Sequence, residues 1–261
     1  MEIFEKLPDE INHLVSEFSS TPVVGDLSCG ITQYSFWLIV STIVLLIVLA
    51  VFKKKQTLVP KGFFVNGFEY IIEYVENDIG KGVVGENWKK HFPFLCSLFL
   101  FILINNMIGL IPGMKPGTGA IGSTAALAIF AFVYFIYYGC KAHGVIGYIK
   151  SLVPSGVPGP MVPIIWFLEF FSMVIRVLTL AVRLYGNMLA GHMVLAVFSL
   201  ATTVFLQQAV FSMDFVTALP AVAWFVLLVL MYAMECLVAF LQAYVLTILS
   251  ASYIGMAVHP H

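Results

Sequence analysis

Seven side chains that could carry protons or charge lie inside two long apolar stretches in the second half of the chain. They are Glu169, Arg176, Arg183, Asn187, His192, Glu235 and Gln242. Carboxylic acids and imidazoles exchange protons, whereas a guanidinium keeps its charge. A charge in the core of a bilayer costs from about 2.5 to more than 10 kcal/mol, so such residues usually face a partner or a water-filled cavity. These residue types therefore point to an ion or proton path.

The composition places these residues in a membrane. Of the 261 residues, 61% are hydrophobic and 10% are charged, whereas soluble domains have about 45–50% and about 25%. This excludes soluble enzymes, disordered proteins and nucleic-acid binders, and the net charge of −1 implies no polyanionic partner. No metal site, disulfide framework or cofactor is expected, because no CxxC or CxxH spacing occurs around the cysteines. These are Cys29, Cys96, Cys140 and Cys236.

Five apolar stretches could cross a bilayer, which takes roughly 20 helical residues. Three have ordinary length and cover residues 34–52, about 92–111 and about 120–138. The other two run from 161 to about 206 and from about 220 to 258. As continuous helices they would measure about 70 and 60 Å. Because neither contains a turn cluster at its middle, we predict two long, strongly tilted helices joined by a short loop near 207–219.

The predicted fold class is an all-α integral membrane protein. It has three ordinary spans, one surface amphipathic helix at about 64–79, and a hairpin of two long tilted helices. The expected order is an extracytoplasmic segment (1–33), a first span (34–52), a cytoplasmic segment with the amphipathic helix (53–91), a two-span hairpin (92–138), a cytoplasmic loop (139–160) and the long hairpin (161–258). One face of the amphipathic helix holds Phe64, Phe68, Ile71, Ile72, Val75 and Ile79.

The lysines predict the orientation in the membrane. If the cluster Lys53–Lys55 is cytoplasmic, nine lysines fall in inside segments and only Lys6 and Lys115 fall outside. Such an excess is typical of the cytoplasmic side. The inside lysines are Lys53, Lys54, Lys55, Lys61, Lys81, Lys89, Lys90, Lys141 and Lys150.

A hairpin with its tip at 212–213 places polar residues of the two long helices at matching heights. Arg183 is then level with Gln242, and His192 is level with Glu235. At about 100° per residue, His192 lies opposite Arg183 on its helix. The residues that share a side with Arg183, within about 40°, are Glu169, Arg176 and Asn187.

Several of these residues also have purely structural interpretations. Glu169 and Arg176 could form an ion pair, His192 could be a satisfied core histidine, and Asn187 could bond between helices. Arg183 differs, because no acidic residue lies three or four positions away. A carboxylate on another chain is its natural counter-charge. Titratable groups on both sides of this fixed cation suggest two half-paths separated by a barrier.

The chain resembles subunit a of rotary F-type ATP synthases in three runs. These are FPFLCSLFLFILINNMIGLIPG (92–113), RVLTLAVRLYGNMLAGH (176–192) and ECLVAFLQAYVLTILSASYI (235–254). The resemblance implies that Arg183 faces the rotating c-ring, draws each ring carboxylate into its deprotonated state and blocks a proton short circuit. It places Gln242 near this arginine and His192 with Glu235 along the outer half-channel.

The resemblance gives the other polar residues weaker roles. Glu169 matches an acidic position of the inner half-channel, and Asn187 matches a position that tunes the path near the arginine. Arg176 matches a basic residue found in some branches only. The order of His192 before Glu235 is the mitochondrial one, since many bacterial members have the two residue types swapped.

The resemblance also implies partners and a location. The partners are the c-ring, the peripheral-stalk b subunits, the other subunits of the complex and the lipid bilayer, with no nucleic acid and no ATP site on this chain. The loop at 115–117 favours a bacterial plasma membrane, and the mitochondrial inner membrane is the alternative. An independent ion channel or secondary transporter is the rival function. A membrane hydrolase would need a motif such as HExxH, which the sequence lacks.

Overall fold

The structure, a computed structural model, describes residues 22–24, 31–55, 62–85, 88–151, 158–212 and 215–258. Five of its helices are long and apolar enough to cross a membrane, so the chain is an all-α integral membrane protein as predicted. Most of the predicted N-terminal segment (1–33) lies outside the described residues.

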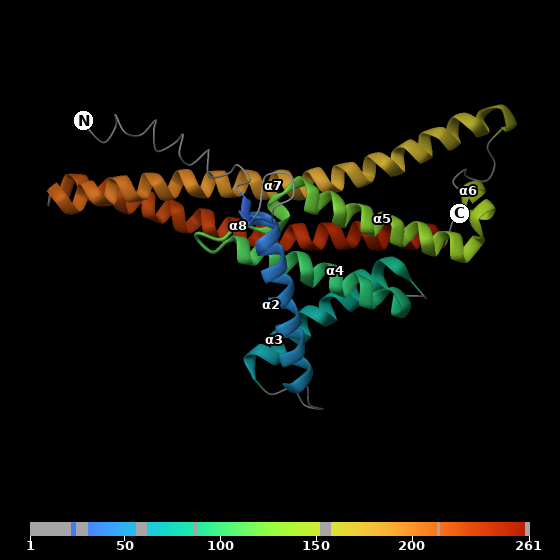
Figure 1. The fold of residues 1–261 in the computed structure, drawn as a ribbon, viewed down its shortest axis with the longest axis horizontal. Coiled ribbons are helices and arrows are strands. Elements are labelled where there is room, and N and C mark those ends of the chain that lie inside the picture. The colour runs from blue at the N-terminus through green and yellow to red at the C-terminus, as the bar shows by residue number, and fades with distance from the viewer. Residues whose placement is uncertain are drawn as a thin grey trace.

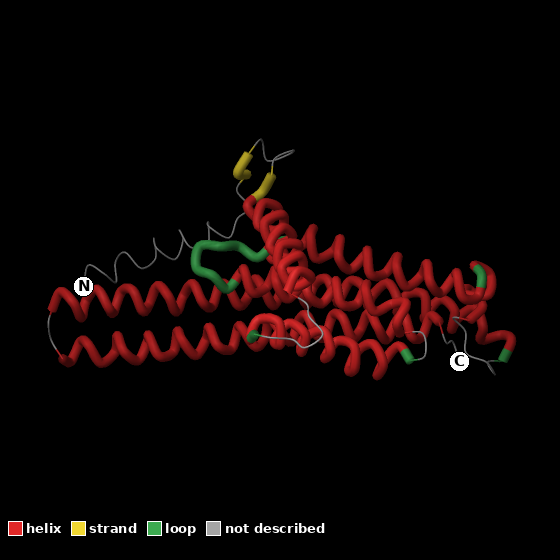
Figure 2. The backbone as a smooth tube through the Cα atoms, turned by 90° about the horizontal axis from the view of Figure 1, so that it is seen from below, coloured by secondary structure: helices red, strands yellow, loops and turns green. Residues whose placement is uncertain are grey.

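The elements follow the predicted order along the chain. Two short strands, β1 (Pro22–Val24) and β2 (Ile31–Thr32), pair antiparallel beside the start of α2 (Figure 2). The helices are α2 (Gln33–Lys55), α3 (Phe63–Tyr74), the π-helix η1 (Val75–Val84), α4 (Trp88–Gly109), the 3₁₀ turn η2 (Gly117–Gly119), α5 (Ile121–His143), α6 (Val145–Ser151), the 3₁₀ turn η3 (Gly159–Met161), α7 (Val162–Ser212) and α8 (Phe215–Val258).

Helices α7 and α8 form the predicted long hairpin. They run side by side along the longest axis of the molecule, whereas α2 stands across them (Figures 1 and 2). With 23 residues, α2 is about 35 Å long and matches the thickness of a bilayer. If α2 crosses the membrane upright, α7 and α8 must be steeply tilted.

The connection between the long helices is shorter than predicted. We expected a loop near 207–219, but α7 continues to Ser212 and α8 begins at Phe215. The residues between 207 and 212 include no Gly or Pro, so nothing in them stops the helix before its end. The chain therefore reverses between Ser212 and Phe215, close to the level at which the heights match.

The amphipathic segment is longer than predicted and changes its helical form. The expected helix at 64–79 is an α-helix up to Tyr74 and a π-helix from Val75 to Val84. Val75 and Ile79 are fully buried, and the π-helix packs against both α4 and α8. The first half instead exposes Phe63 and Phe64. The π-helix also exposes Asn77, Asp78 and Lys81, so it keeps the amphipathic character that the periodicity predicted.

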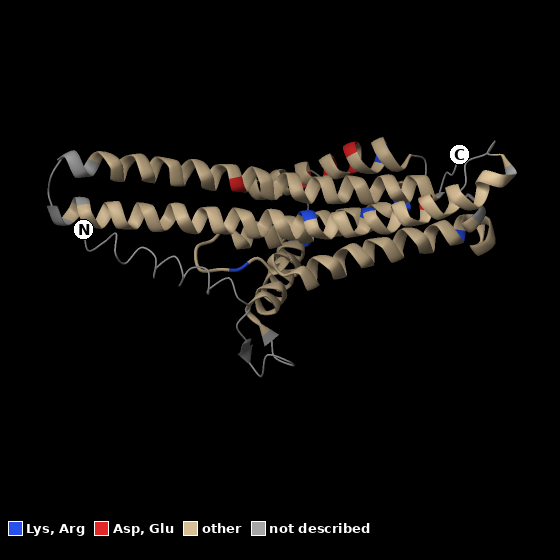
Figure 3. Ribbon diagram, turned by 90° about the horizontal axis from the view of Figure 1, so that it is seen from above, with Lys and Arg blue, Asp and Glu red and all other residues tan. Residues whose placement is uncertain are grey.

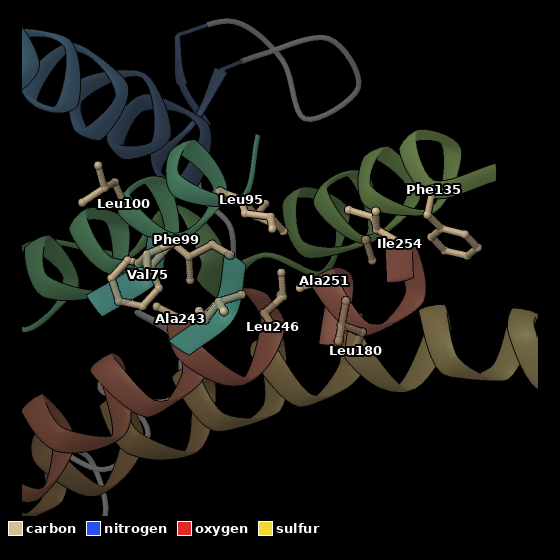
Figure 4. Packing of buried hydrophobic residues seen from close by; sticks show 14 of the residues in the cluster. Val75, Leu95, Phe99, Leu100, Phe135, Leu180, Ala243, Leu246, Ala251 and Ile254 are labelled. Carbon is tan, nitrogen blue, oxygen red and sulfur yellow. The ribbon is translucent and has the colours of Figure 1, made fainter. Parts of the chain in front are cut away.

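The hydrophobic core lies where α4, α5, α7, α8 and the π-helix meet. Val75, Leu95 and Phe99 pack there against Leu246 and Ile254 of α8 (Figure 4). Leu180, Ala181 and Leu184 of α7 belong to the same cluster. Burial of such side chains stabilises the fold by about 1.5–3 kcal/mol each relative to exposure in water. This core fixes the middle of α7, where most of the polar residues lie.

Candidate functional site

Arg183 lies on the exposed face of α7, although its neighbours are buried. Leu184 is fully buried and Leu180 is 5% exposed, so the helix is anchored on both sides of the arginine. Among the residues that the structure describes, Arg183 has no ion pair or hydrogen bond. Beyond it, α7 carries no further charge up to the tip, and α8 carries only Glu235 (Figure 3). The charge therefore points out of the chain.

Glu235 is buried against a glycine of the opposite helix. Its residue is 8% exposed, and its Oε1 atom has no hydrogen-bond partner within the described part of the chain. A Cβ atom at Gly191 would collide with this carboxyl group. The structure therefore brings Glu235 beside the residue that precedes His192, which agrees with the predicted level of the pair.

A cavity of about 720 Å³ opens beside His192. It lies between α7 and the connection from α4 to α5, and the N-terminal end of α2 also lines it. Tyr232, one helical turn before Glu235, belongs to the same wall. Polar groups on the wall can hold water, which a proton path requires. They include Tyr34, Lys115, His192, Ser199, Thr203 and Tyr232.

A buried polar network holds this end of the molecule together. Thr118 donates to the Asn106 side chain at 2.9 Å, and Asn106 donates to the Ala239 carbonyl of α8 at 3.3 Å. Ser41 of α2 donates to Asn105 at 2.8 Å. Both asparagines are essentially fully buried. The network fixes α8 between Glu235 and Gln242, because Ala239 lies between them.

Glu169 and Arg176 form the ion pair that their spacing allowed. Their side chains approach to 3.8 Å, and both are partly exposed. The Arg176 guanidinium also lies over the Tyr253 ring, at 5.7 Å from its centre. Such an exposed pair contributes little to stability, about 0–1 kcal/mol. The two side chains are therefore close enough to form the ion pair that their spacing of seven residues allowed.

The two remaining predicted residues, Gln242 and Asn187, are both more buried than Arg183. Gln242 is 8% exposed on α8, and Asn187 is half-buried on α7 with its Nδ2 atom unpartnered among the described residues. Within these residues no three His, Cys, Asp or Glu side chains group as a metal site would require. The structure thus separates the exposed Arg183 from the partly buried His192 and the buried Glu235, which lie on the other side of α7.

Comparison with known proteins decides the family. Residues 35–255 match the family model described as ATP synthase A chain. The chain belongs to the ATP synthase A chain family. The resemblance to subunit a of F-type ATP synthases is therefore confirmed. Membership of this family makes the chain a membrane subunit of an F-type ATP synthase.

Relatives of the A chain family occur in several bacteria. The chain is 35% identical to ATP synthase subunit a of Chlorobium phaeobacteroides over 90% of its length and 67% of the relative. It is 34% identical to that of Nocardioides sp. over 88% of its length and 82% of the relative. It is 42% identical to that of Brucella canis over 74% of each chain.

Several residues that line the cavity or hold the nearby helices were not identified as functional candidates from the sequence. Tyr34, Lys115 and Tyr232 line the cavity although they are far apart along the chain. The adjacent pair Asn105 and Asn106 did carry a signal, since two amides inside an apolar span must find partners. Gly191 gave none, because its importance depends on contact with α8.

Gly191 tests whether the close approach of Glu235 matters in this A chain. We expect Gly191→Ala to displace the Glu235 carboxyl, because the added methyl group would overlap with it. Overpacking of this kind typically lowers stability by about 1–3 kcal/mol. ATP-driven proton pumping in membrane vesicles should fall about tenfold or more. Gly186→Ala is the control, since a Cβ atom there meets nothing within 4 Å. Equal pumping by the two variants would contradict the role of this contact.

Proposed function

We propose that the chain is the stator subunit of the membrane motor of an ATP synthase. Two offset half-channels on this chain deliver protons to, and remove them from, carboxylates on a rotating ring of c subunits. Proton flow then turns the ring and is coupled to ATP synthesis on other subunits. The chain is bound by the peripheral-stalk b subunits, and it lies in a bacterial plasma membrane with Lys53–Lys55 in the cytoplasm.

The observation that carries this proposal is Arg183, an exposed cation inside a membrane helix without a counter-charge among the described residues. A guanidinium does not lose its proton. Exposed to lipid it would cost several kcal/mol, so it must meet an anion on a partner. A carboxylate at the surface of a ring satisfies this requirement once for each passing subunit.

The cavity beside His192 supports the outer half-channel. It lies at the end of the molecule where α2 begins, which the lysine distribution assigns to the outside. Water in the cavity would bring protons to His192, and Glu235 of α8 lies against Gly191, the residue that precedes His192 on α7. From there protons would pass to the ring. On α7, Asn187 lies between His192 and Arg183, and Gln242 of α8 is level with Arg183.

The inner half-channel is assigned to the end of α7 that holds Glu169. The Glu169 carboxylate, whose nearest cation is Arg176 at 3.8 Å, would receive a proton that leaves the ring. Arg183 separates the two paths. Because a proton that crossed directly would have to pass this fixed charge, it would be forced to travel with the ring instead.

The energies are of the right size for such a motor. Two unit charges 4 Å apart attract by about 4 kcal/mol at an effective dielectric of 20. A proton that moves through 100 mV releases about 2.3 kcal/mol. The arginine can therefore favour loss of a proton from the ring carboxylate, and reprotonation from the outer path can release the carboxylate again. Rotation need not stall at the arginine.

Gly186, on the exposed side of α7 near Arg183, offers a test of the ring interface. A Cβ atom at this position meets nothing within 4 Å in the chain, so a large side chain fits the isolated subunit. We expect Gly186→Phe to leave the chain intact but to lower ATP-driven pumping at least tenfold, because the side chain would occupy the space of the ring. Pumping and co-purification of c subunits are both measured.

Gly122→Phe is the matched control, since this glycine of α5 also has open space around it. It should pump normally. If the chain were an independent channel or transporter, c subunits would not co-purify with it, and its ion flux would not depend on ATP. Normal pumping by Gly186→Phe would place the ring elsewhere and overturn the proposed interface.

A further inference from the structure

Two lysines from different helices lie over one tyrosine ring at the base of α4 and α5. The Lys90 ammonium is 5.5 Å from the centre of the Tyr138 ring, and the Lys141 ammonium is 6.0 Å from it. Lys90 belongs to the first turn of α4 and Lys141 to the last turn of α5. We name this arrangement the Tyr138 platform. It brings the start of α4 and the end of α5, each with one lysine, to the same tyrosine ring.

The platform is rigid beneath the lysines. The Tyr138 ring packs edge-on against His91 at 4.6 Å and lies 4.7 Å from the Tyr134 ring. Tyr134 in turn stacks on Phe94 at 3.7 Å. His91 is 1% exposed. Cation–π attraction therefore holds both ammonium groups over a fixed surface, at about 0.5–1 kcal/mol for each exposed contact.

Neither cation of the platform is paired with an acidic side chain in the described part of the chain. Within the described ranges neither Lys90 nor Lys141 has a carboxylate within 4 Å, whereas nearby Lys81 is paired with Glu76 at 2.8 Å. Both side chains of the platform lysines are exposed. Lysine has a flexible stem that carries a point charge, so each ammonium group can move from the Tyr138 ring towards an anion nearby.

Apolar side chains border the platform on the side of α6. Val145 is 63% exposed and Ile146 is 73% exposed, only a few residues after Lys141. They are held in place because Tyr148 of the same helix packs on Gly139, where a Cβ atom would lie 2.5 Å from the tyrosine ring. Burial raises the pKa of the Tyr148 phenol above its usual value. A charged centre beside fixed apolar groups matches an amphipathic ligand.

The position of the platform in the membrane indicates the class of this ligand. Lysines and aromatic residues at the end of apolar helices lie at the level of the lipid headgroups. Trp88 is at the same level, with the Lys89 ammonium 5.9 Å from the centre of its ring. We propose that the Tyr138 platform binds one anionic phospholipid, with its phosphate between Lys90 and Lys141 and its acyl chains beside Val145 and Ile146. This site is separate from the proton path.

Binding of short-chain lipids to the full chain in neutral detergent tests the proposal. We expect dioctanoyl phosphatidylglycerol to bind more tightly than dioctanoyl phosphatidylcholine. Each basic residue near a membrane surface contributes about 1 kcal/mol, so Lys90→Gln with Lys141→Gln should weaken binding about thirtyfold, at about tenfold per 1.4 kcal/mol. In 1 M salt the preference should nearly vanish, because the Debye length falls to about 3 Å.

Two matched double variants make the test specific. Lys54→Gln with Lys55→Gln removes the same charge from the exposed end of α2 and should leave binding unchanged. Lys90→Arg with Lys141→Arg keeps the charge and should preserve binding, which also shows that the site tolerates substitution. Equal losses in the two glutamine variants would overturn the site. Competition by inorganic phosphate at the same concentration as the lipid would show a simple anion site and would also overturn it.

Discussion

Arg183→Ala should abolish ATP-driven proton pumping in vesicles that contain the assembled complex. The residue is the exposed intramembrane cation for which the described part of the chain offers no partner. Alanine would leave ring carboxylates without the charge that favours their deprotonation, an attraction of about 4 kcal/mol at 4 Å and a dielectric of 20. We expect a loss of at least a hundredfold, measured by acidification of the vesicle interior.

The passive proton leak separates the two roles of Arg183. If the charge also blocks a direct path, the leak of Arg183→Ala vesicles without ATP should exceed that of the unchanged protein. Arg183→Lys keeps a charge but loses the planar fork of donors, and it should restore only part of the pumping. Lys55→Ala serves as the control cation, because Lys55 is exposed in the last turn of α2 and has no place in the proposed path. Normal pumping by Arg183→Ala, with assembly shown, would mean that this chain is not the ion-path stator.

Glu235→Gln is expected to have the second-largest effect. The substitution keeps the size of a side chain that is 8% exposed and lies against Gly191, but it removes the group that exchanges protons. A single positioned acid–base group typically contributes about 10²–10⁴-fold to a proton-transfer rate. We expect pumping to fall by roughly 10²-fold, at the lower end, since His192 remains.

Two further variants define what the Glu235 result means. Glu235→Asp keeps the acid and should retain most of the pumping, because its shorter side chain still points into the same space. Glu76→Gln removes a carboxylate that pairs with Lys81 on the surface, and it should pump normally. If Glu235→Gln pumped as well as Glu235→Asp, the outer path would have to bypass this residue.

The sequence predicted the elements whose signals are local. Arg183 and the other polar residues of the two long helices stood out because they interrupt apolar runs. The position of the tip followed from matching Arg183 with Gln242 and His192 with Glu235. The spacing of seven residues also predicted that Glu169 could meet Arg176, which the structure confirms at 3.8 Å.

Features that depend on contacts between distant segments were not predictable in the same way. Periodicity described 64–79 as one amphipathic α-helix, yet from Val75 the helix is a π-helix that packs against α4 and α8. Packing close to Gly80, where a Cβ atom would lie 3.3 Å from Trp88, and close to Gly255, where it would lie 3.1 Å from the Val83 carbonyl, accompanies this form. Likewise, the cavity joins residues from α2, α7 and α8 that no local pattern connects.

The unbroken length of α7 has a mechanical consequence. In the motor proposed above, a rotor that pushed against Arg183 would exert an equal and opposite force on this chain, which would have to withstand it. Arg183 lies 21 residues from Val162 and 29 from Ser212, so the load falls near the middle of a beam about 76 Å long. Leu180 and Leu184 seat this point in the core, and α5 and α8 support the helix alongside. In such a motor, α7 would therefore resist bending at Arg183. The force on Arg183 would be transmitted to α5, α8 and the hydrophobic core.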